Sequence, residues 1–132
     1  MNNKTILKAF FDEVKANLNA SLTKPIKTFV NGFSNLETIQ DPSLLFVVNS
    51  ALVSRGSTSR EISTVSASFI VKISKSLDPQ GDLLGMVDEI QEFVFERPHL
   101  GGVTMASFDK WEMDTLEQGQ AGILAIDLEL II

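Results

Sequence analysis

The sequence predicts one α+β domain spanning residues 1–132, in which a mostly antiparallel sheet of two hairpins packs with two helices. Three observations predict it: two stretches with apolar residues at helical spacing, two stretches in which apolar and polar residues alternate, and turn-forming residues between them. The length of 132 residues and a hydrophobic fraction of 44% suit one domain with a closed core. The predicted element order is α-β-ββ-α-ββ.

The N-terminal quarter of the chain is predicted to contain one helix and one short strand. Residues 3–20 carry apolar residues at helical spacing, and Pro25 prevents the helix from extending much further. Residues 26–30 follow as a short strand. The pair Asn31–Gly32 is a common tight-turn dipeptide, and the chain then continues as a loop to Asp41.

The first predicted hairpin contains the clearest strand patterns. Residues 43–53 form a continuous apolar run rich in β-branched and aromatic residues, which favours a strand over a helix. Residues 55–60 form a polar turn or loop, and a strand with strict alternation follows. Its apolar residues point to one side: Val65, Ala67, Phe69, Val71 and Ile73.

The C-terminal half is predicted to contain a helix and a second hairpin. The helix extends from Asp82, interpreted as its N-cap, to Arg97. Residues 103–113 and 121–132 form the two strands, joined by a polar turn at residues 114–120. The last strand places apolar residues on one side: Leu124, Ile126, Leu128 and Leu130.

Charge is distributed unevenly along the chain. The net charge of −6 disfavours nucleic acid as a ligand. Residues 1–75 hold nine basic and five acidic residues, a net charge of +4, whereas residues 76–132 hold two basic and twelve acidic residues, a net charge of −10. The two halves can neutralise each other within one fold, or the basic surface of one copy can meet the acidic surface of another.

Residue patterns typical of catalytic, cofactor or metal sites are missing from the sequence. There is no cysteine, no phosphate-binding glycine motif, and only one histidine, His99, expected to lie exposed in a loop. Asp127 and Glu129 are interpreted as acids on the exposed face of an edge strand. Trp111 suits the core or an interface equally. An enzyme would need a site built from a few late residues: Asp109, Glu112, Asp127, Glu129 or His99.

The sequence also predicts where the protein is found. No apolar run reaches the roughly 18 residues that would span a bilayer, and the first residues lack the pattern of a secretory signal. We therefore expect a soluble protein that is made in a cytoplasm and does not bind a membrane.

Several local strings, in this element order, resemble one family of phage proteins. The strings are Asp41–Val48, a Pro-led apolar strand; Glu61–Ile73, a long alternating strand; Asp82–Ile90, the start of a helix; and Leu124–Leu130, a closing strand. With the amphipathic helix that opens the chain, they resemble the tail terminator proteins of long-tailed bacteriophages, the lambda-type minor tail protein U group. The resemblance covers nearly the whole chain as pattern.

The resemblance implies a structural role in the virion tail. Such proteins assemble in the host bacterial cytoplasm into a ring, typically a hexamer, that caps the head-proximal end of the tail tube. The ring ends tube polymerisation and offers a surface for a head-completion or connector protein, and DNA passes through its centre without specific binding. The resemblance implies no reaction and no cofactor.

Ring formation requires two different patches of each copy to meet, and charged residues are the candidates for these contacts. We expect subunit or tail-tube contacts at five of them: Arg55, Arg60, Lys72, Asp127 and Glu129. Two alternatives remain open. The chain can be a head-completion or neck subunit of the virion, or a small cytoplasmic binding module with a pocket between the sheet and the helix at residues 82–97.

Overall fold

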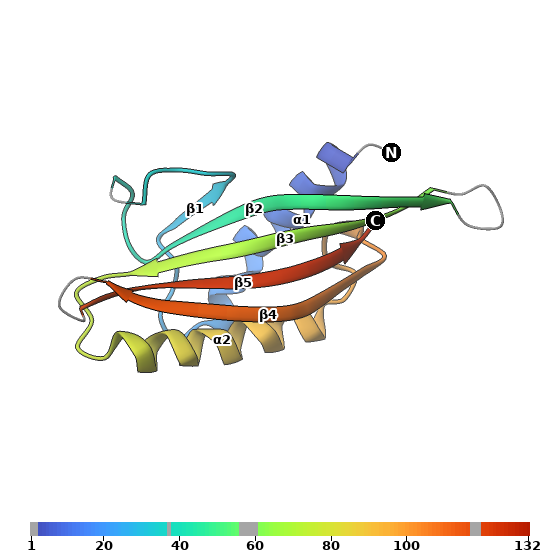
Figure 1. Cartoon of the computed structure of the whole chain (residues 1–132). Helices are drawn as coiled ribbons and strands as arrows, with labels where there is room; N and C mark the ends of the chain where they lie inside the picture. Colours follow the sequence, from blue (N-terminus) through green and yellow to red (C-terminus); the bar gives the residue numbers. More distant parts are fainter. Residues whose placement is uncertain (1–2, 37, 56–60, 117–119) are drawn as a thin grey trace.

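A computed structural model describes residues 3–36, 38–55, 61–116 and 120–132, with backbone only at residues 54, 55, 61 and 116. The described chain forms two α-helices and five strands, so the predicted α+β class and element order are confirmed (Figure 1). The elements are α1 Asn3–Asn17, β1 Thr28–Asn31, β2 Ser43–Arg55, β3 Glu61–Ile73, α2 Pro79–Glu96, β4 Met105–Leu116 and β5 Ala121–Ile131. Short 3₁₀ helices occupy Leu18–Ser21 and Leu100–Gly102.

The five strands form one sheet in the order β1-β2-β3-β5-β4. Both predicted hairpins are present, because β2 pairs with β3 and β4 pairs with β5 in antiparallel register. Of the predicted turns at residues 55–60 and 114–120, residues 56–60 and 117–119 lie outside the described residues. The prediction is wrong for residues 114–116, which continue strand β4 because they still pair with β5. The interpretation of the last strand as an edge strand is wrong, since β5 pairs with β3 on its other side and β4 forms that edge.

Both helices pack on one face of this sheet, and the hydrophobic core lies between them and the strands (Figure 1). On the side of α1, the rings of Phe10, Phe46 and Phe69 are buried with centroid separations of 5.5 Å from Phe10 to Phe46 and 5.8 Å from Phe46 to Phe69. Helix α2 covers β4 and β5. The predicted inward faces of β3 and β5 are confirmed, because all nine of their predicted apolar residues are buried.

The start of α2 differs from the prediction. The helix begins at Pro79, and its N-cap is Asp78, whose Oδ1 accepts a hydrogen bond of 3.1 Å from the backbone N–H of Gly81. The prediction of Asp82 as the N-cap is therefore wrong. Proline favours the first helical position because it has no N–H to leave unpaired there, which allows the helix to start three residues before Asp82.

The short strand β1 pairs in parallel with β2, with Thr28 opposite Ser43. Asn31–Gly32 is therefore not the turn of a hairpin. Gly32 has a φ of +116° and donates its N–H to the carbonyl of Phe46 at 2.8 Å, at the end of the parallel pairing. The chain must then return along a loop before β2 begins, and Lys72 donates to the Leu36 carbonyl of this loop at 3.2 Å.

Removing one ring of the phenylalanine cluster should strongly destabilise the fold. We expect Phe46→Ala to lower the free energy of unfolding by about 3–5 kcal/mol, because the side chain is fully buried and its loss leaves a cavity. Urea unfolding of the variant measures this. Phe33→Ala is the control, since Phe33 is 80% exposed and its loss should change stability by about 0.5 kcal/mol or less. Equal effects of the two substitutions would refute the account of the core.

Candidate assembly surface

The β2–β3 hairpin extends beyond the rest of the sheet. β3 pairs with β5 only from Thr64 onwards, and β1 pairs with β2 only as far as Phe46. Residues 53–55 and 61–63 therefore form a two-stranded segment that projects past the other strands and both helices (Figure 1). Leu52 lies at the base of this segment, opposite Thr64 in the last row shared with β5. We call these seven residues the projecting ribbon.

The projecting ribbon exposes apolar side chains on both faces. Leu52 is 77%, Val53 61% and Ile62 39% accessible to solvent. Side chains alternate between the two faces along a strand, and Val65 is buried on the face that carries the helices. Counting from Val65 places Leu52 and Ile62 on the face away from the helices and Val53 on the helix side. A two-stranded segment is marginally stable alone in water, and grouped exposed apolar residues are typical of contact surfaces. The ribbon is therefore the candidate assembly surface.

The apolar character continues from the ribbon across the helix-free face of the sheet. Leu52 lies opposite Thr64, which pairs with Ile131, which in turn pairs with Met105 on the edge strand β4. Ile131 is half-buried and Met105 is exposed. This row extends the ribbon's apolar surface to the opposite edge of the sheet.

A second row on the same face is polar and is satisfied within the chain. Asn49 Nδ2 donates to Ser68 Oγ at 2.8 Å, and Ser68 Oγ donates to Asp127 Oδ1 at 2.7 Å. Lys110 Nζ lies 3.9 Å from Asp127 Oδ2. These four residues come from β2, β3, β5 and β4, so the row connects the four long strands. Its hydrogen bonds engage Asp127 within its own subunit.

The other charged residues predicted to make contacts do not gather in one place. Lys72 is half-buried and bonded to the Leu36 carbonyl, while Glu129 is exposed on the helix-free face between Ser66 and Ser107. Arg60 and the side chain of Arg55 lie outside the described residues. Of the predicted contact residues, Arg55 lies in the ribbon by its backbone position at the end of β2, whereas Lys72, Asp127 and Glu129 lie elsewhere. The sequence reasoning missed the apolar residues of the ribbon.

The residues considered for an enzyme site are spread over the surface. His99 is exposed, with Nδ1 2.7 Å from the Thr104 carbonyl oxygen, as a loop histidine was expected to be. Asp109 lies in a bulge of β4, and Glu112 lies exposed on the helix-free face. Among the described residues, no three His, Asp or Glu side chains are grouped as a metal site would require. Trp111 is half-exposed on the helix side of β4.

Hollows on the surface of the described chain include one beside α2 and one beside the segment before β1. One of about 350 Å³ lies between α2 and β4, lined by Val94, Phe95 and Phe108 among others. It occupies the region where a pocket between the sheet and the helix at 82–97 was predicted. The other, about 600 Å³, is lined by three lysines and one carboxylate: Lys24, Lys27, Lys75 and Asp41.

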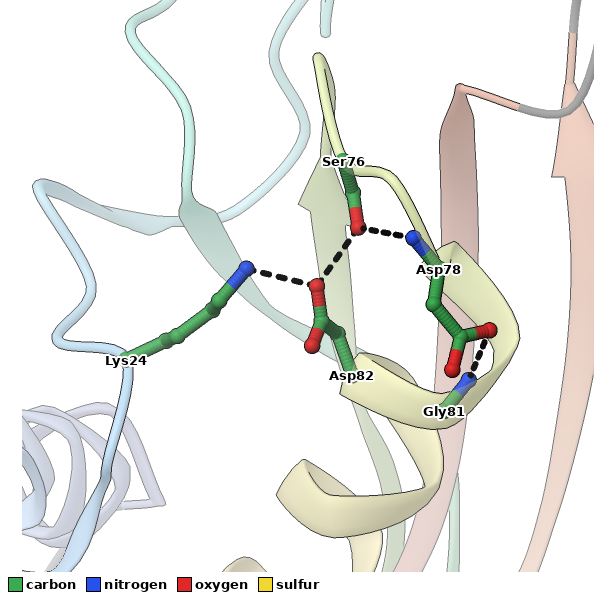
Figure 2. Close-up of polar contacts among 5 residues, drawn as sticks. All are labelled: Lys24, Ser76, Asp78, Gly81 and Asp82. Atoms are coloured by element: carbon green, nitrogen blue, oxygen red, sulfur yellow. Dashed lines mark hydrogen bonds and ion pairs between the residues drawn. The ribbon is translucent and has the colours of Figure 1, made fainter.

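A polar clamp ties the segment before β1 to the start of α2, and Figure 2 shows it. Lys24 Nζ and Ser76 Oγ both reach Asp82 Oδ2, each at 2.5 Å. Ser76 Oγ also accepts from the backbone N–H of Asp78 at 3.2 Å. Figure 1 places the start of α2 at the end of the molecule opposite the projecting ribbon. The clamp therefore stabilises the body without involving the candidate surface.

The clamp makes stability depend on pH. The hydrogen bonds from Lys24 and Ser76, with the charge of Lys24, lower the pKa of Asp82 below its ordinary value of 3.8 against the opposing effect of burial. Because folding lowers this pKa, ionised Asp82 stabilises the fold at pH values above its pKa in the unfolded chain. This stabilisation is lost as the pH falls through the pKa of Asp82 in the folded protein. The contribution is modest because the pair is partly exposed.

We expect Asp82→Asn to lower the free energy of unfolding by about 1 kcal/mol or less near neutral pH and to reduce its decline on acidification. Urea unfolding at about pH 7 and about pH 3 measures both effects. Asp88→Asn, on the exposed side of the same helix, is the control. Its free energy of unfolding should decline on acidification as much as that of the unaltered chain. An Asp82→Asn variant with an unchanged decline would contradict this account of the clamp.

No protein-family model matches the chain, and a search of curated proteins finds no match either. Within the described residues, neither helix has the combination of length and apolar character needed to cross a membrane. The arguments about function therefore rest on the fold and the candidate assembly surface.

Proposed function

We propose that this chain is a structural phage protein that forms a ring on the head-proximal end of the tail tube, ends tube polymerisation and provides the head-joining surface. The local strings that resemble the tail terminator proteins support this reading, and the α+β fold is consistent with it. The observation that carries the proposal is the projecting ribbon, whose apolar side chains Leu52 and Val53 are mostly exposed and whose Ile62 is partly exposed in the described part of the subunit.

The sheet topology suits head-to-tail association. The ribbon extends from β2 and β3, whereas the opposite edge of the sheet is β4, separated from β2 by β3 and β5. A contact between two different patches on opposite sides of each copy is heterologous. Such contacts generate a closed ring when the rotations from each copy to the next add up to a full turn. A hexamer is the proposed ring size, from the resemblance.

The helix-free face of the sheet suits the wall of a DNA channel. Among the described strand residues, it carries four carboxylates against two lysines: Glu112, Asp114, Asp127 and Glu129, with Lys72 and Lys110. A wall with excess negative charge does not hold phosphates by counterion release, so DNA can slide along it. In the proposed ring this face therefore lines the channel, and the helices face outwards.

Replacing the ribbon's exposed apolar groups should abolish the ring without unfolding the subunit. We expect the double substitution Leu52→Ser and Ile62→Ser to prevent ring formation, because it removes apolar area that only a neighbour can bury. Mass measurement in solution and electron microscopy, with and without tail tubes, record the rings. Leu77→Ser is the control, since Leu77 is fully exposed outside the ribbon. Rings of normal size from the ribbon variant would exclude the ribbon from assembly.

Charge reversal between β2 and β3 tests the polar part of the same contact. We expect Arg55→Glu with Arg60→Glu to impair ring formation or tail capping, because these residues supply positive charge at the end of β2 and just before β3 in the sequence. Circular dichroism and urea unfolding check that the subunit is intact. Normal capping by this variant would exclude both arginines from the contact.

A binding assay separates the proposed role from that of a head-completion or neck subunit, which would also form a ring. The chain should bind purified tail tubes and limit their length during polymerisation. Binding to DNA-filled heads in the absence of tails, with no effect on tube length, would assign it to the head instead. A chain that stays monomeric with either partner would contradict both roles.

A further inference from the structure

The hollow of about 600 Å³ is lined by lysines from two segments that lie far apart in the sequence. Lys24 and Lys27 belong to the segment before β1, and Lys75 follows the end of β3. The loop before β2 contributes residues 40–42 to the same lining. The fold therefore brings three cationic side chains together around one hollow, which we call the lysine pocket.

The positive charge of the lysine pocket is not neutralised within the described chain. Its lining holds three lysines and one carboxylate, a net charge of +2. Lys24 Nζ is engaged at 2.5 Å by Asp82 Oδ2, as Figure 2 shows. Neither Lys27 nor Lys75 forms an ion pair with a described residue, and both side chains are exposed. Two ammonium groups are therefore available to a ligand.

The one carboxylate of the pocket is largely occupied by the protein. Asp41 Oδ2 accepts a hydrogen bond from Ser74 Oγ, and Asp41 Oδ1 is buried without a hydrogen-bond partner in the described chain. The exposed polar groups of the pocket are thus mainly donors. An ammonium group donates up to three hydrogen bonds and accepts none, so this lining suits an oxyanion.

The backbone of Lys75 lies in a conformation that residues with a Cβ rarely adopt. Its φ is +55°, in the left-handed region. The next residue, Ser76, is held on both sides, because its N–H donates to the Gln120 carbonyl at 2.9 Å and its Oγ bonds to Asp82 in the clamp. Glycine would adopt this φ without strain, whereas a lysine adds an ammonium group beside the pocket. Strained residues of this kind are typical of ligand sites.

The size of the pocket and the charge of the whole chain favour a small ligand. A volume of about 600 Å³ lies within the range of small-molecule sites and exceeds what a single inorganic ion fills. The net charge of −6 repels a long polyanion such as DNA at a distance, and this repulsion grows with the charge of the ligand. A small anion is repelled less and still reaches the local positive charge.

We propose that the lysine pocket binds a small molecule with at least two anionic oxygen groups, held by the ammonium groups of Lys27 and Lys75. The two groups are phosphates or carboxylates, since both present oxyanions to an ammonium donor. The site is separate from the projecting ribbon, and the proposal does not depend on ring formation.

Titration calorimetry with two probes, inorganic pyrophosphate and citrate, tests the proposal. At low ionic strength at least one of them should bind with a stoichiometry of about one per subunit, and added NaCl should weaken the binding. The tighter probe identifies the anionic group as phosphate or carboxylate. Absence of binding by both probes would overturn the proposal. A DNA duplex that binds through the same lysines while neither probe does would overturn the assignment to a small molecule.

Substitutions in the pocket separate a built site from general attraction to positive charge. Lys27→Gln and Lys75→Gly should each weaken binding of the tighter probe about tenfold, because a charge-assisted hydrogen bond is lost. Lys15→Gln is the control, since Lys15 is exposed on α1 and does not line the pocket, and it should leave the affinity unchanged. Equal losses in all three variants, or no loss in either pocket variant, would contradict the proposal.

The glycine variant also distinguishes ligand binding from a role in folding. Glycine accommodates a φ of +55°, so Lys75→Gly should leave the midpoint of urea unfolding unchanged or raise it while the affinity for the probe falls. A Lys75→Gly variant that binds the probe normally would remove Lys75 from the site and contradict the proposal.

Discussion

Strands β2 and β3 are longer than the strands and helices that cover them, and this difference in length creates the candidate assembly surface on which the proposed function depends. Each strand has thirteen residues, yet β3 has a partner in β5 only from Thr64 and β2 has one in β1 only to Phe46. Backbone hydrogen bonding between the two strands can continue into the ribbon, but burial of side chains cannot, because the helices pack elsewhere. Exposed apolar groups on such a segment lower the free energy when a second surface covers them.

The body of the protein holds this ribbon in a defined direction. The cluster of Phe10, Phe46 and Phe69 fixes α1 on β2 and β3, and a slip of one residue in either strand would turn their buried side chains to the other face. Hydrogen bonds across the helix-free face connect the same strands to β5. The orientation of the ribbon is therefore set within the subunit, which would reduce the entropy lost in the proposed association.

The parts of the fold that depend on local pattern, including the two hairpins, could be predicted from the sequence, whereas the pairings between strands that are not neighbours in the chain could not. Strict alternation identified β3 and β5 and their buried faces. The parallel pairing of β1 and the central place of β5 are contacts between distant residues, which no local pattern encodes. For the candidate site, the apolar run at residues 43–53 was recognised as a strand. A continuous run cannot reveal that Leu44 to Val47 are buried while Leu52 and Val53 are exposed.

The central claim is that a second copy covers the projecting ribbon, and amide hydrogen exchange at several protein concentrations tests it most directly. The account predicts that the amides of residues 52–55 and 61–63 exchange more slowly as the concentration rises, while those around the phenylalanine cluster in β2 and β3 stay equally protected throughout. Exchange in the ribbon that is equally fast at every concentration, with assembled rings present, would show that the ribbon stays uncovered and would contradict the account.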